Sequence, residues 1–281
     1  MRTSIIGASG LLGKYLVRDW KRDAVIALSS KDVDIRQRQQ VRGILERYRP
    51  ESIVLAAAYT DVDGCEANPE LAFSINATGA LNVAEAAKEY GAHLLFLSTD
   101  YVFDGTKSAP YETNDPRNPQ SVYGRSKAEA EIGILRLLSD ACIVRTSWLF
   151  GTTGKCFPET ILRLARDRTM IDVVNDQRGA PTYARHLAHA IIDLAHKRCH
   201  GIIHASNAGD CSWFEFASEI IRISGAATVI RPTTTELFPR PAKRPTYSVL
   251  SPKSLQRYGI EMPTWKEALE EYLNERSSAG L

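Results

Sequence analysis

The stretch that decides the fold is Thr3-Ser4-Ile5-Ile6-Gly7-Ala8-Ser9-Gly10-Leu11-Leu12-Gly13, near the start of the 281-residue chain. Its first four residues predict a buried strand, and three glycines follow at once with the spacing G-x-x-G-x-x-G. Apolar residues then recur at the spacing of one helix face. This order favours dinucleotide binding, because glycine lets the backbone approach a pyrophosphate and a helix N-terminus presents unpaired N–H groups. The turn therefore predicts a cofactor site made of Gly7, Ser9, Gly10, Leu11, Leu12 and Gly13.

Short apolar runs and longer helical patterns alternate through the first half of the chain. The runs are continuously apolar, which is typical of strands buried on both faces of a parallel sheet. Repeated strand–helix–strand units of this kind predict an α/β fold with a Rossmann-like, doubly wound parallel sheet. The predicted strands are Thr3–Ile6, Val25–Leu28, Ile53–Ala57, Leu94–Ser98 and Ala141–Arg145, and a long Ala-rich helix is expected to begin near Pro69.

The pattern loosens after about Phe150. Strands are expected at Ile171–Val174 and Ile202–Ala205, and the proline-rich residues 231–247 are predicted to form a loop. Helices are expected at Ile161–Ala165, Leu187–His196, Phe214–Ile223 with Ser212 as N-cap, and Trp265–Tyr272. We expect residues 1–149 with about 171–205 to form an NAD(P)-binding domain. About 150–170 with 206–281 would form a smaller C-terminal lobe, with the substrate in the cleft between them.

Composition and charge narrow the class of protein. The net charge is +2, the hydrophobic fraction 44% and the charged fraction 24%, which gives no electrostatic case for a nucleic-acid or membrane-surface protein. No apolar run reaches the roughly 18 residues that cross a bilayer, and the start lacks a signal-peptide pattern. We therefore expect a cytoplasmic protein. No C-x-x-C pair occurs, so no zinc site is indicated.

Tyr123 and Lys127 lie four residues apart, so both side chains fall on one face of a predicted helix. A phenol with a pKa of about 10 is a poor acid near neutral pH, but a nearby ammonium lowers that pKa. Thr99 ends the fourth predicted strand, where ligands of doubly wound sheets bind. We predict that Tyr123 gives a proton to a carbonyl oxygen, that Lys127 lowers the Tyr123 pKa, and that Thr99 hydrogen-bonds that oxygen.

The end of the second predicted strand bears on the choice of cofactor. An acid at this point would bind the ribose 2′-hydroxyl of NAD and repel a 2′-phosphate. Here Ser29, Ser30 and Lys31 follow the strand, and their hydroxyls and ammonium suit a 2′-phosphate. NADPH is therefore the expected cofactor, and NADH remains possible.

With these motifs in order, the chain resembles the extended short-chain dehydrogenase/reductase family. Within it, longer strings are similar to those of the dTDP-4-dehydrorhamnose reductase family, over nearly the whole chain from Gly7 to about Leu273. The strings are Ser98-Thr99-Asp100-Tyr101-Val102-Phe103-Asp104-Gly105, Val122-Tyr123-Gly124-Arg125-Ser126-Lys127, Arg145-Thr146-Ser147-Trp148, Asn175-Asp176-Gln177-Arg178-Gly179-Ala180-Pro181-Thr182 and Pro241-Ala242-Lys243-Arg244-Pro245.

The resemblance implies a reaction in polysaccharide biosynthesis: hydride transfer to the carbon-4 ketone of a dTDP-4-keto-6-deoxy sugar, giving dTDP-L-rhamnose. Lys127 would also hold the nicotinamide ribose. Further cofactor contacts are implied for Gly10, Leu11 and Leu12 at the pyrophosphate, Asp34 and Ile35 at the adenine, and Ala57, Ala58, Tyr59 and Thr60 near the ribose. Substrate contacts are implied for Thr99, Asp100, Tyr101 and Trp148, with Lys243 and Arg244 near the diphosphate.

The resemblance leaves alternatives open. Another 4-keto sugar-nucleotide reductase or an epimerase would carry the same motifs, and some similar proteins are regulatory subunits of methionine adenosyltransferase. The three residues Thr99, Tyr123 and Lys127 together favour an enzyme. Some family members form a homodimer bridged by magnesium through carboxylates. Tyr15 stands where one of those carboxylates is expected, so we predict no metal bridge and leave a homodimer as possible.

Overall fold

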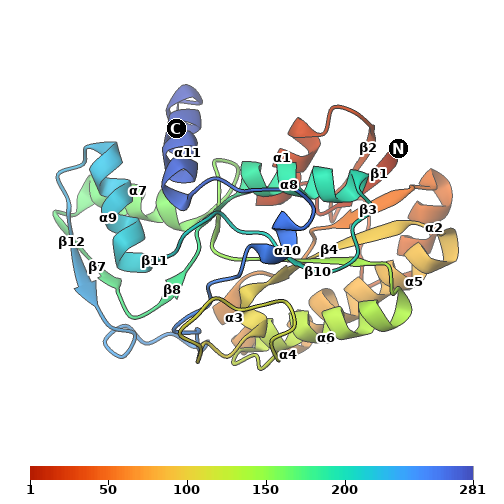
Figure 1. Ribbon diagram of the computed structural model, residues 1–281, viewed down its shortest axis with the longest axis horizontal. Coiled ribbons are helices and arrows are strands. Elements are labelled where there is room, and N and C mark those ends of the chain that lie inside the picture. Colours follow the sequence, from red (N-terminus) through yellow and green to blue (C-terminus); the bar gives the residue numbers. More distant parts are fainter. Residues whose placement is uncertain (281) are drawn as a thin grey trace.

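A computed structural model describes residues 1–280, and within them six parallel strands form one sheet (Figure 1). The strand order is β10-β5-β4-β3-β1-β2. The order reverses beside β1, so the carboxyl ends of β1 and β3 form the crevice where ligands of such sheets bind. This confirms the predicted doubly wound α/β fold. The strands are β1 (Arg2–Ile6), β2 (Ala24–Leu28), β3 (Ser52–Leu55), β4 (His93–Thr99), β5 (Cys142–Thr146) and β10 (Gly201–His204).

Helices cover both faces of the sheet (Figure 1). Leu95 and Leu97 of β4 face the side of α1 and α8, while Leu94 and Phe96 face the side of α2, α5 and α6. Every residue of β3 and β4 is buried, which explains why these strands are apolar without alternation. The helices are α1 (Leu11–Asp19), α2 (Arg38–Tyr48), α5 (Ala80–Tyr90), α6 (Val122–Leu137) and α8 (Ala184–His196).

The chain between β3 and α5 is helical for most of its length. The expected helix begins at Pro69, as predicted, but a wider turn interrupts it before α5. The strand predicted at Ile53–Ala57 is shorter at its end than expected, because β3 ends at Leu55. The N–H groups of Ala56 and Ala57 both donate to the carbonyl of Ile6. The elements here are α3 (Val62–Ala67), α4 (Pro69–Phe73) and the π-helical turn η1 (Ser74–Gly79).

The smaller part of the molecule lies on the left in Figure 1 and contains three two-stranded sheets. Their strands are β6 (Leu149–Phe150) with β9 (Thr182–Tyr183), β7 (Met170–Val174) with β12 (Val229–Thr233), and β8 (Arg178–Gly179) with β11 (Cys211–Ser212). Its helices are α7 (Phe157–Asp167), α9 (Trp213–Ser224) and α11 (Trp265–Ser278), whereas α10 (Lys253–Gln256) lies beside β10 of the central sheet. Ser212 caps α9 as predicted, in a capping box with Glu215.

Two expectations for this part change. The first residues of the loop predicted at 231–247 belong instead to strand β12. Pro232 lies within this strand, in a two-stranded sheet with β7, and proline is tolerated at the edge of a sheet. The strand predicted at Ile171–Val174 forms, but it pairs with β12 rather than with the central sheet. That pairing argues for counting β7 with the smaller lobe. The last residue of the expected lobe, Leu281, lies outside the described residues.

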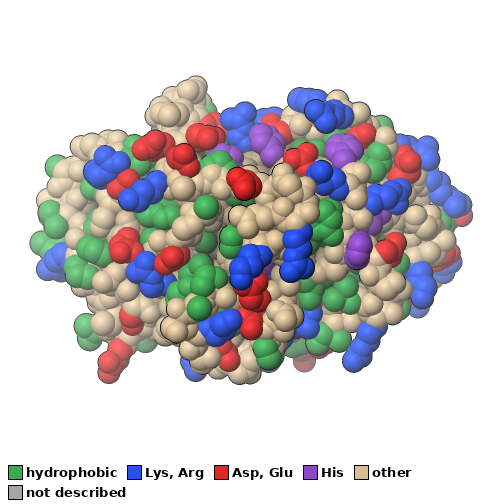
Figure 2. All heavy atoms as spheres, viewed as in Figure 1, with side chains coloured by type: hydrophobic (Ala, Val, Ile, Leu, Met, Phe, Trp, Pro, Cys, Tyr) green, Lys and Arg blue, Asp and Glu red, His purple; other side chains and the backbone are tan. Residues whose placement is uncertain are grey.

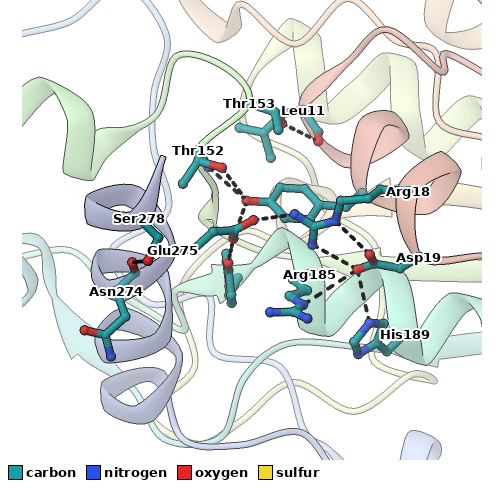
Figure 3. A network of polar contacts seen from close by, with 12 residues as sticks. Leu11, Arg18, Asp19, Thr152, Thr153, Arg185, His189, Asn274, Glu275 and Ser278 are labelled. Atoms are coloured by element: carbon teal, nitrogen blue, oxygen red, sulfur yellow. Dashed lines mark hydrogen bonds and ion pairs between the residues drawn. The ribbon is translucent and has the colours of Figure 1, made fainter. Parts of the chain in front are cut away.

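Figure 3 shows how α11 attaches to the helices above the sheet. Glu275 of α11 accepts hydrogen bonds from Tyr15 (3.0 Å) and Arg18 of α1 and from Tyr183. Tyr15 also contacts the Thr152 hydroxyl at 2.9 Å. These contacts join the start of the chain to its last helix and fix α1, whose N-terminus follows the glycine turn.

The molecular surface mixes both signs of charge. On the face drawn in Figure 2, Lys and Arg side chains are interspersed with Asp and Glu. None of the helices formed by residues 1–280 combines the length and apolar character needed to cross a membrane. Within the same residues, no group of three or more His, Cys, Asp and Glu side chains is placed to hold a metal ion.

Candidate active site

The glycine turn packs so closely that side chains cannot replace its hydrogens. Gly7 has a φ of 99°, and a Cβ there would lie 2.5 Å from the nitrogen of Ala57. A Cβ on Gly13 would lie 2.1 Å from the carbonyl oxygen of Gly7. Gly10 is the N-cap of α1 and donates to the same carbonyl at 3.0 Å. The turn therefore sets the N-terminus of α1 against the carboxyl end of β1, as anion binding requires.

A cavity of about 520 Å³ opens beside this turn, at the carboxyl ends of β1 and β2. Nine of the predicted cofactor residues line it: Gly7, Ser9, Gly10, Ser29, Ser30, Asp34, Ile35, Ala57 and Ala58. The lining combines glycine, alanine and apolar side chains with the hydroxyls of Ser9, Ser29 and Ser30 and the charged groups of Asp34 and Arg36. The residues present thus fit the adenosine and phosphates of a dinucleotide.

Other predicted cofactor residues lie elsewhere. Leu12 is 6% exposed and packs in the core with Tyr15 and Leu16, so only its backbone is available to a phosphate. Lys31 is exposed on the turn after β2 and is not among the residues that line the cavity. Leu11 and Gly13 begin α1 without lining the cavity.

The hydroxyls at the end of β2 differ in their partners. Asp32 accepts hydrogen bonds from both the backbone nitrogen (2.7 Å) and the hydroxyl (2.6 Å) of Ser29. Ser30 is exposed and lines the cavity. Arg36, which the sequence interpretation missed, also lines the cavity and forms an ion pair with Asp34 at 2.7 Å. Ser30 and Arg36 are therefore the polar groups at this end that are placed to meet a 2′-phosphate.

Asn76 is a second residue that the sequence did not indicate. Its side-chain oxygen accepts from the nitrogen of Tyr59 (2.8 Å), and its amide donates to the Tyr59 carbonyl (3.0 Å) and to Ser126 of α6 (3.0 Å). Asn76 is 1% exposed. It holds the segment after β3, which includes Tyr59 and the exposed Thr60, against the helix that carries Tyr123.

The structure brings Thr99 and Tyr123 together at the carboxyl end of β4, and it packs Lys127 against Phe96 of the same strand. Ser121 caps α6 by accepting from the nitrogen of Gly124 at 3.1 Å, so Tyr123 lies in the first turn. Thr99 ends β4 and caps the short helix η2 (Asp100–Val102). The Thr99 side chain hydrogen-bonds the Tyr123 phenol. This bond acts to lower the Tyr123 pKa, although burial has the larger, opposite effect.

Burial reverses the expected effect of the Tyr–Lys pair on acidity. It raises the pKa of Tyr123 above the ordinary value, whereas the spacing alone predicted a decrease. Burial also lowers the pKa of Lys127 to about 7, and its Nζ lies 3.9 Å from the centroid of the Phe96 ring. Desolvation of the buried phenol disfavours its charged form and outweighs the effect that the spacing of the pair predicted, which explains the difference.

Two further predicted residues, Asp100 and Tyr101, border Tyr123. The Tyr101 ring meets the Tyr123 ring edge-on, with centroids 5.8 Å apart. Asp100 is 2% exposed, and burial raises the pKa of its carboxyl to about 6, although hydrogen bonds with Ser248 and Thr99 act to lower it. A buried acid, Asp100, and one phenol, Tyr101, therefore border the Tyr123 hydroxyl.

Trp148 is held in a strained backbone conformation, with a φ of 45°. Its indole stacks on Trp213, with ring centroids 3.5 Å apart and ring planes 6° apart. A Cβ on Gly179 would lie 2.5 Å from the indole, so this glycine leaves room for it. Strain of this kind on a bulky residue is typical of functional positions. Trp213 was not indicated by the sequence.

Lys243 and Arg244 lie on the proline-rich loop beside the start of α6 and Tyr101. The Nζ of Lys243 is 3.4 Å from the side-chain oxygen of Gln120. Arg244 forms an ion pair with Asp63 of α3 at 3.1 Å, and Arg240 pairs with the same carboxylate at 2.6 Å. Arg244 also hydrogen-bonds the Tyr101 side chain and acts to lower the Tyr101 pKa, which burial raises. Asp63, unnoticed in the sequence, thus fastens this loop near the predicted site.

The comparison with known proteins agrees with this arrangement. The family model described as RmlD substrate binding domain matches residues 1–278. The chain is 44% identical over 278 residues to the spore coat polysaccharide biosynthesis protein SpsK of Bacillus subtilis (strain 168), covering 98% of each chain. It is 39% identical to a dTDP-4-dehydrorhamnose reductase of Aggregatibacter actinomycetemcomitans, covering 96% of this chain and 97% of that one.

A solved structure is similar over the same length. The dTDP-4-dehydrorhamnose reductase of Bacillus anthracis in complex with NADP matches with a TM-score of 0.95 and 40% identity, covering 98% of this chain and 99% of that chain. The fold, the glycine turn and the Thr-Tyr-Lys group had pointed to the same class of protein. This chain belongs to the RmlD substrate binding domain family.

Proposed function

We propose that this protein is an NADPH-dependent reductase that converts dTDP-4-dehydro-L-rhamnose to dTDP-L-rhamnose. The observation that carries the proposal is the hydrogen bond between Thr99 and Tyr123 at the end of β4, with Lys127 packed against Phe96 of the same strand, two strands along the sheet from β1 and its glycine turn. The family, and the activity of the relatives named above, support it. An oxidoreductase of polysaccharide biosynthesis follows from the same relatives.

The cofactor would lie along the carboxyl ends of β1, β2 and β3. Gly7, Ser9, Gly10 and the backbone of Leu11, Leu12 and Gly13 would meet the pyrophosphate. Ser29, Ser30, Asp34 and Ile35, which line the cavity with Arg36, would meet the adenosine end, and Lys31 would reach it from the exposed turn after β2. Ala57, Ala58, Tyr59 and Thr60 would lead toward the second ribose, where Tyr123 and Lys127 bind. Bound NADPH supplies the hydride.

Tyr123 donates its proton to the oxygen of the reduced ketone. Its pKa is raised by burial, so the hydroxyl carries its proton over the whole neutral range. Thr99 hydrogen-bonds the same oxygen and the phenol, which aligns the donor with the developing alkoxide. The ammonium form of Lys127 stabilises the phenolate left behind.

The substrate would lie against the smaller lobe. Asp100, Tyr101 and Trp148 would contact the sugar, and Lys243 and Arg244 would face the nucleotide diphosphate. In this arrangement residues 1–149 with part of 171–205 bind the cofactor, and 150–170 with 206–281 close over the substrate. The pairing of β7 with β12 favours assigning Met170–Val174 to the second unit.

The experiment is a panel of NADPH and NADH against dTDP- and UDP-linked 4-keto sugars, with unstable substrates generated by a coupled enzyme. We expect stoichiometric loss of reduced nicotinamide with the dTDP-linked substrate and a preference for NADPH. Turnover of another 4-keto sugar nucleotide alone would reassign the substrate. An epimerase would give no net cofactor loss. A regulatory subunit would give no turnover with any pair.

A cytoplasmic location and a possible homodimer without bridging metal complete the proposal. Tyr15, at the position where a metal-binding carboxylate was expected, instead contacts Thr152 and Glu275. Sedimentation of the purified protein should give the same mass with magnesium or with a chelator. A dimer that forms only on adding magnesium would contradict this part.

A further inference from the structure

A fully buried carboxylate lies one helical turn beyond Lys127. Glu131 follows Lys127 by four residues and Tyr123 by eight, so the three side chains share the face of α6 that packs on the sheet. Glu131 is 0% exposed. The proposed chemistry uses Tyr123 and Lys127 and leaves Glu131 without a role. A charge in this position is expensive to bury unless it is paired.

Both carboxylate oxygens of Glu131 are fully engaged. Oε1 accepts from the hydroxyl of Ser98 (2.5 Å) and from Nε of Arg145 (2.9 Å). Oε2 accepts from Nη2 of Arg145 (2.7 Å) and from Nε of Arg117 (2.6 Å). Ser98 and Arg145 face each other in register on β4 and β5. Glu131 therefore fixes α6 to these two strands and to the loop that carries Arg117.

The two arginines differ in their access to solvent. Arg145 is 0% exposed, whereas the Arg117 side chain is 25% exposed. Together they place two positive charges against one negative charge, close to the ammonium of Lys127. Burial lowers the pKa of Lys127 to about 7, and Glu131 is the charge that acts against burial. The protonation of Lys127 thus depends on how much of the Glu131 charge the arginines neutralise.

We propose that Glu131 is a positioning residue for the reaction: it holds the catalytic face of α6 on the sheet and keeps Lys127 in its ammonium form, with Arg117 as the partner that limits this effect. The inference rests on the proposed role of Lys127. It is tested separately from turnover, because Lys127 can be titrated in the protein without cofactor or substrate.

Other ionisable groups face this region from the elements packed around it. His204 of β10 lies 3.3 Å from Arg145, and burial and Arg145 lower its pKa to about 3, so it is neutral near pH 7. Glu66 of α3 is engaged with the backbone nitrogen of Val122. The remaining groups are Tyr123 on α6, Asp100 on η2, Arg145 on β5, Cys65 on α3 and Arg117 on the loop.

The experiment compares Glu131→Gln, Arg117→Gln and Glu129→Gln. Glu129 is exposed on the same helix, so its variant makes the same change of charge on the solvent face. The titration midpoint of Lys127 is followed by the ¹³Cε shift in labelled protein, assigned with Lys127→Met. The pH dependence of the NADPH dissociation constant and of kcat/KM is measured in parallel.

We expect the Lys127 midpoint to fall by about one pH unit or more in Glu131→Gln, to rise in Arg117→Gln, and to stay unchanged in Glu129→Gln. The upper limit of the kcat/KM profile should move with it. Equal midpoints in Glu131→Gln and Glu129→Gln, or shifts of the same sign in Glu131→Gln and Arg117→Gln, would overturn the proposal. If Glu131→Gln does not fold, Arg117→Gln decides: a rise supports the proposal and an unchanged midpoint refutes it.

Discussion

The indole of Trp148 lies flat on that of Trp213, with ring planes 6° apart. Trp148 follows β5, and Trp213 begins α9 in the smaller lobe, so the stack joins the two parts of the molecule beside the proposed sugar site. The strained backbone of Trp148 makes its orientation dependent on that partner.

Replacing Trp213 with Leu should therefore weaken substrate binding. An aromatic pair of this kind contributes about 0.5–1.5 kcal/mol, so KM for the sugar nucleotide should rise by roughly 2- to 12-fold. The NADPH dissociation constant should not change. Phe214→Leu, the next residue on α9, is the matched control. An equal rise of KM in both variants would show general loosening of α9 instead.

Ser30 tests the choice of cofactor. Its exposed side chain lines the cavity at the end of β2, where a 2′-phosphate would lie. Ser30→Glu should raise KM for NADPH by about 10-fold or more through repulsion, and should change KM for NADH little. Ser30→Gln has the same bulk without the charge and should keep the NADPH preference. Equal losses in the two variants would mean that size, rather than charge, matters there.

Asp63 links stability to pH. Although burial acts to raise it, Arg244 and Arg240 hold the pKa of Asp63 at about 2, below its ordinary 3.8. A depressed pKa gives stability that is present above about pH 4 and is lost as the pH falls toward 2. Asp63→Asn should lower the free energy of unfolding by about 1–2 kcal/mol at pH 7, measured by urea denaturation. The difference from the parent should shrink toward pH 2.

Glu70→Gln, an exposed change on the neighbouring helix α4, provides the control for that measurement. It should leave stability nearly unchanged. A destabilisation by Asp63→Asn that is the same at pH 7 and pH 2.5 would exclude the ion pairs as its source.

Local sequence patterns predicted the elements whose structure depends on residues close together in the chain. The strands of the central sheet are apolar throughout because both of their faces are buried, and the glycine turn is fixed by contacts among residues close in sequence. The Tyr123–Lys127 pair was found because helical spacing places both residues on one face. Glu131 continues that spacing, so the same pattern carried a signal for it.

The features that the sequence did not predict depend on contacts between residues that are distant in the chain. Arg240 and Asp63 are separated by 177 residues, and neither shows in its own surroundings that it has a partner. Strand β12 contains Pro232, which indicates a loop until β7 is known to lie beside it. The Tyr123 pKa moves opposite to the prediction, because burial by several elements outweighs the neighbouring Lys127. Tertiary packing, which no local window contains, decides all three.

Tyr123→Phe is the most direct test of the central claim that this hydroxyl gives its proton to the reduced ketone. We predict that turnover of NADPH with the 4-keto sugar nucleotide falls by about 10²- to 10⁴-fold, the usual contribution of a general acid, while NADPH binding is unchanged. Turnover within about threefold of the parent protein would contradict the account.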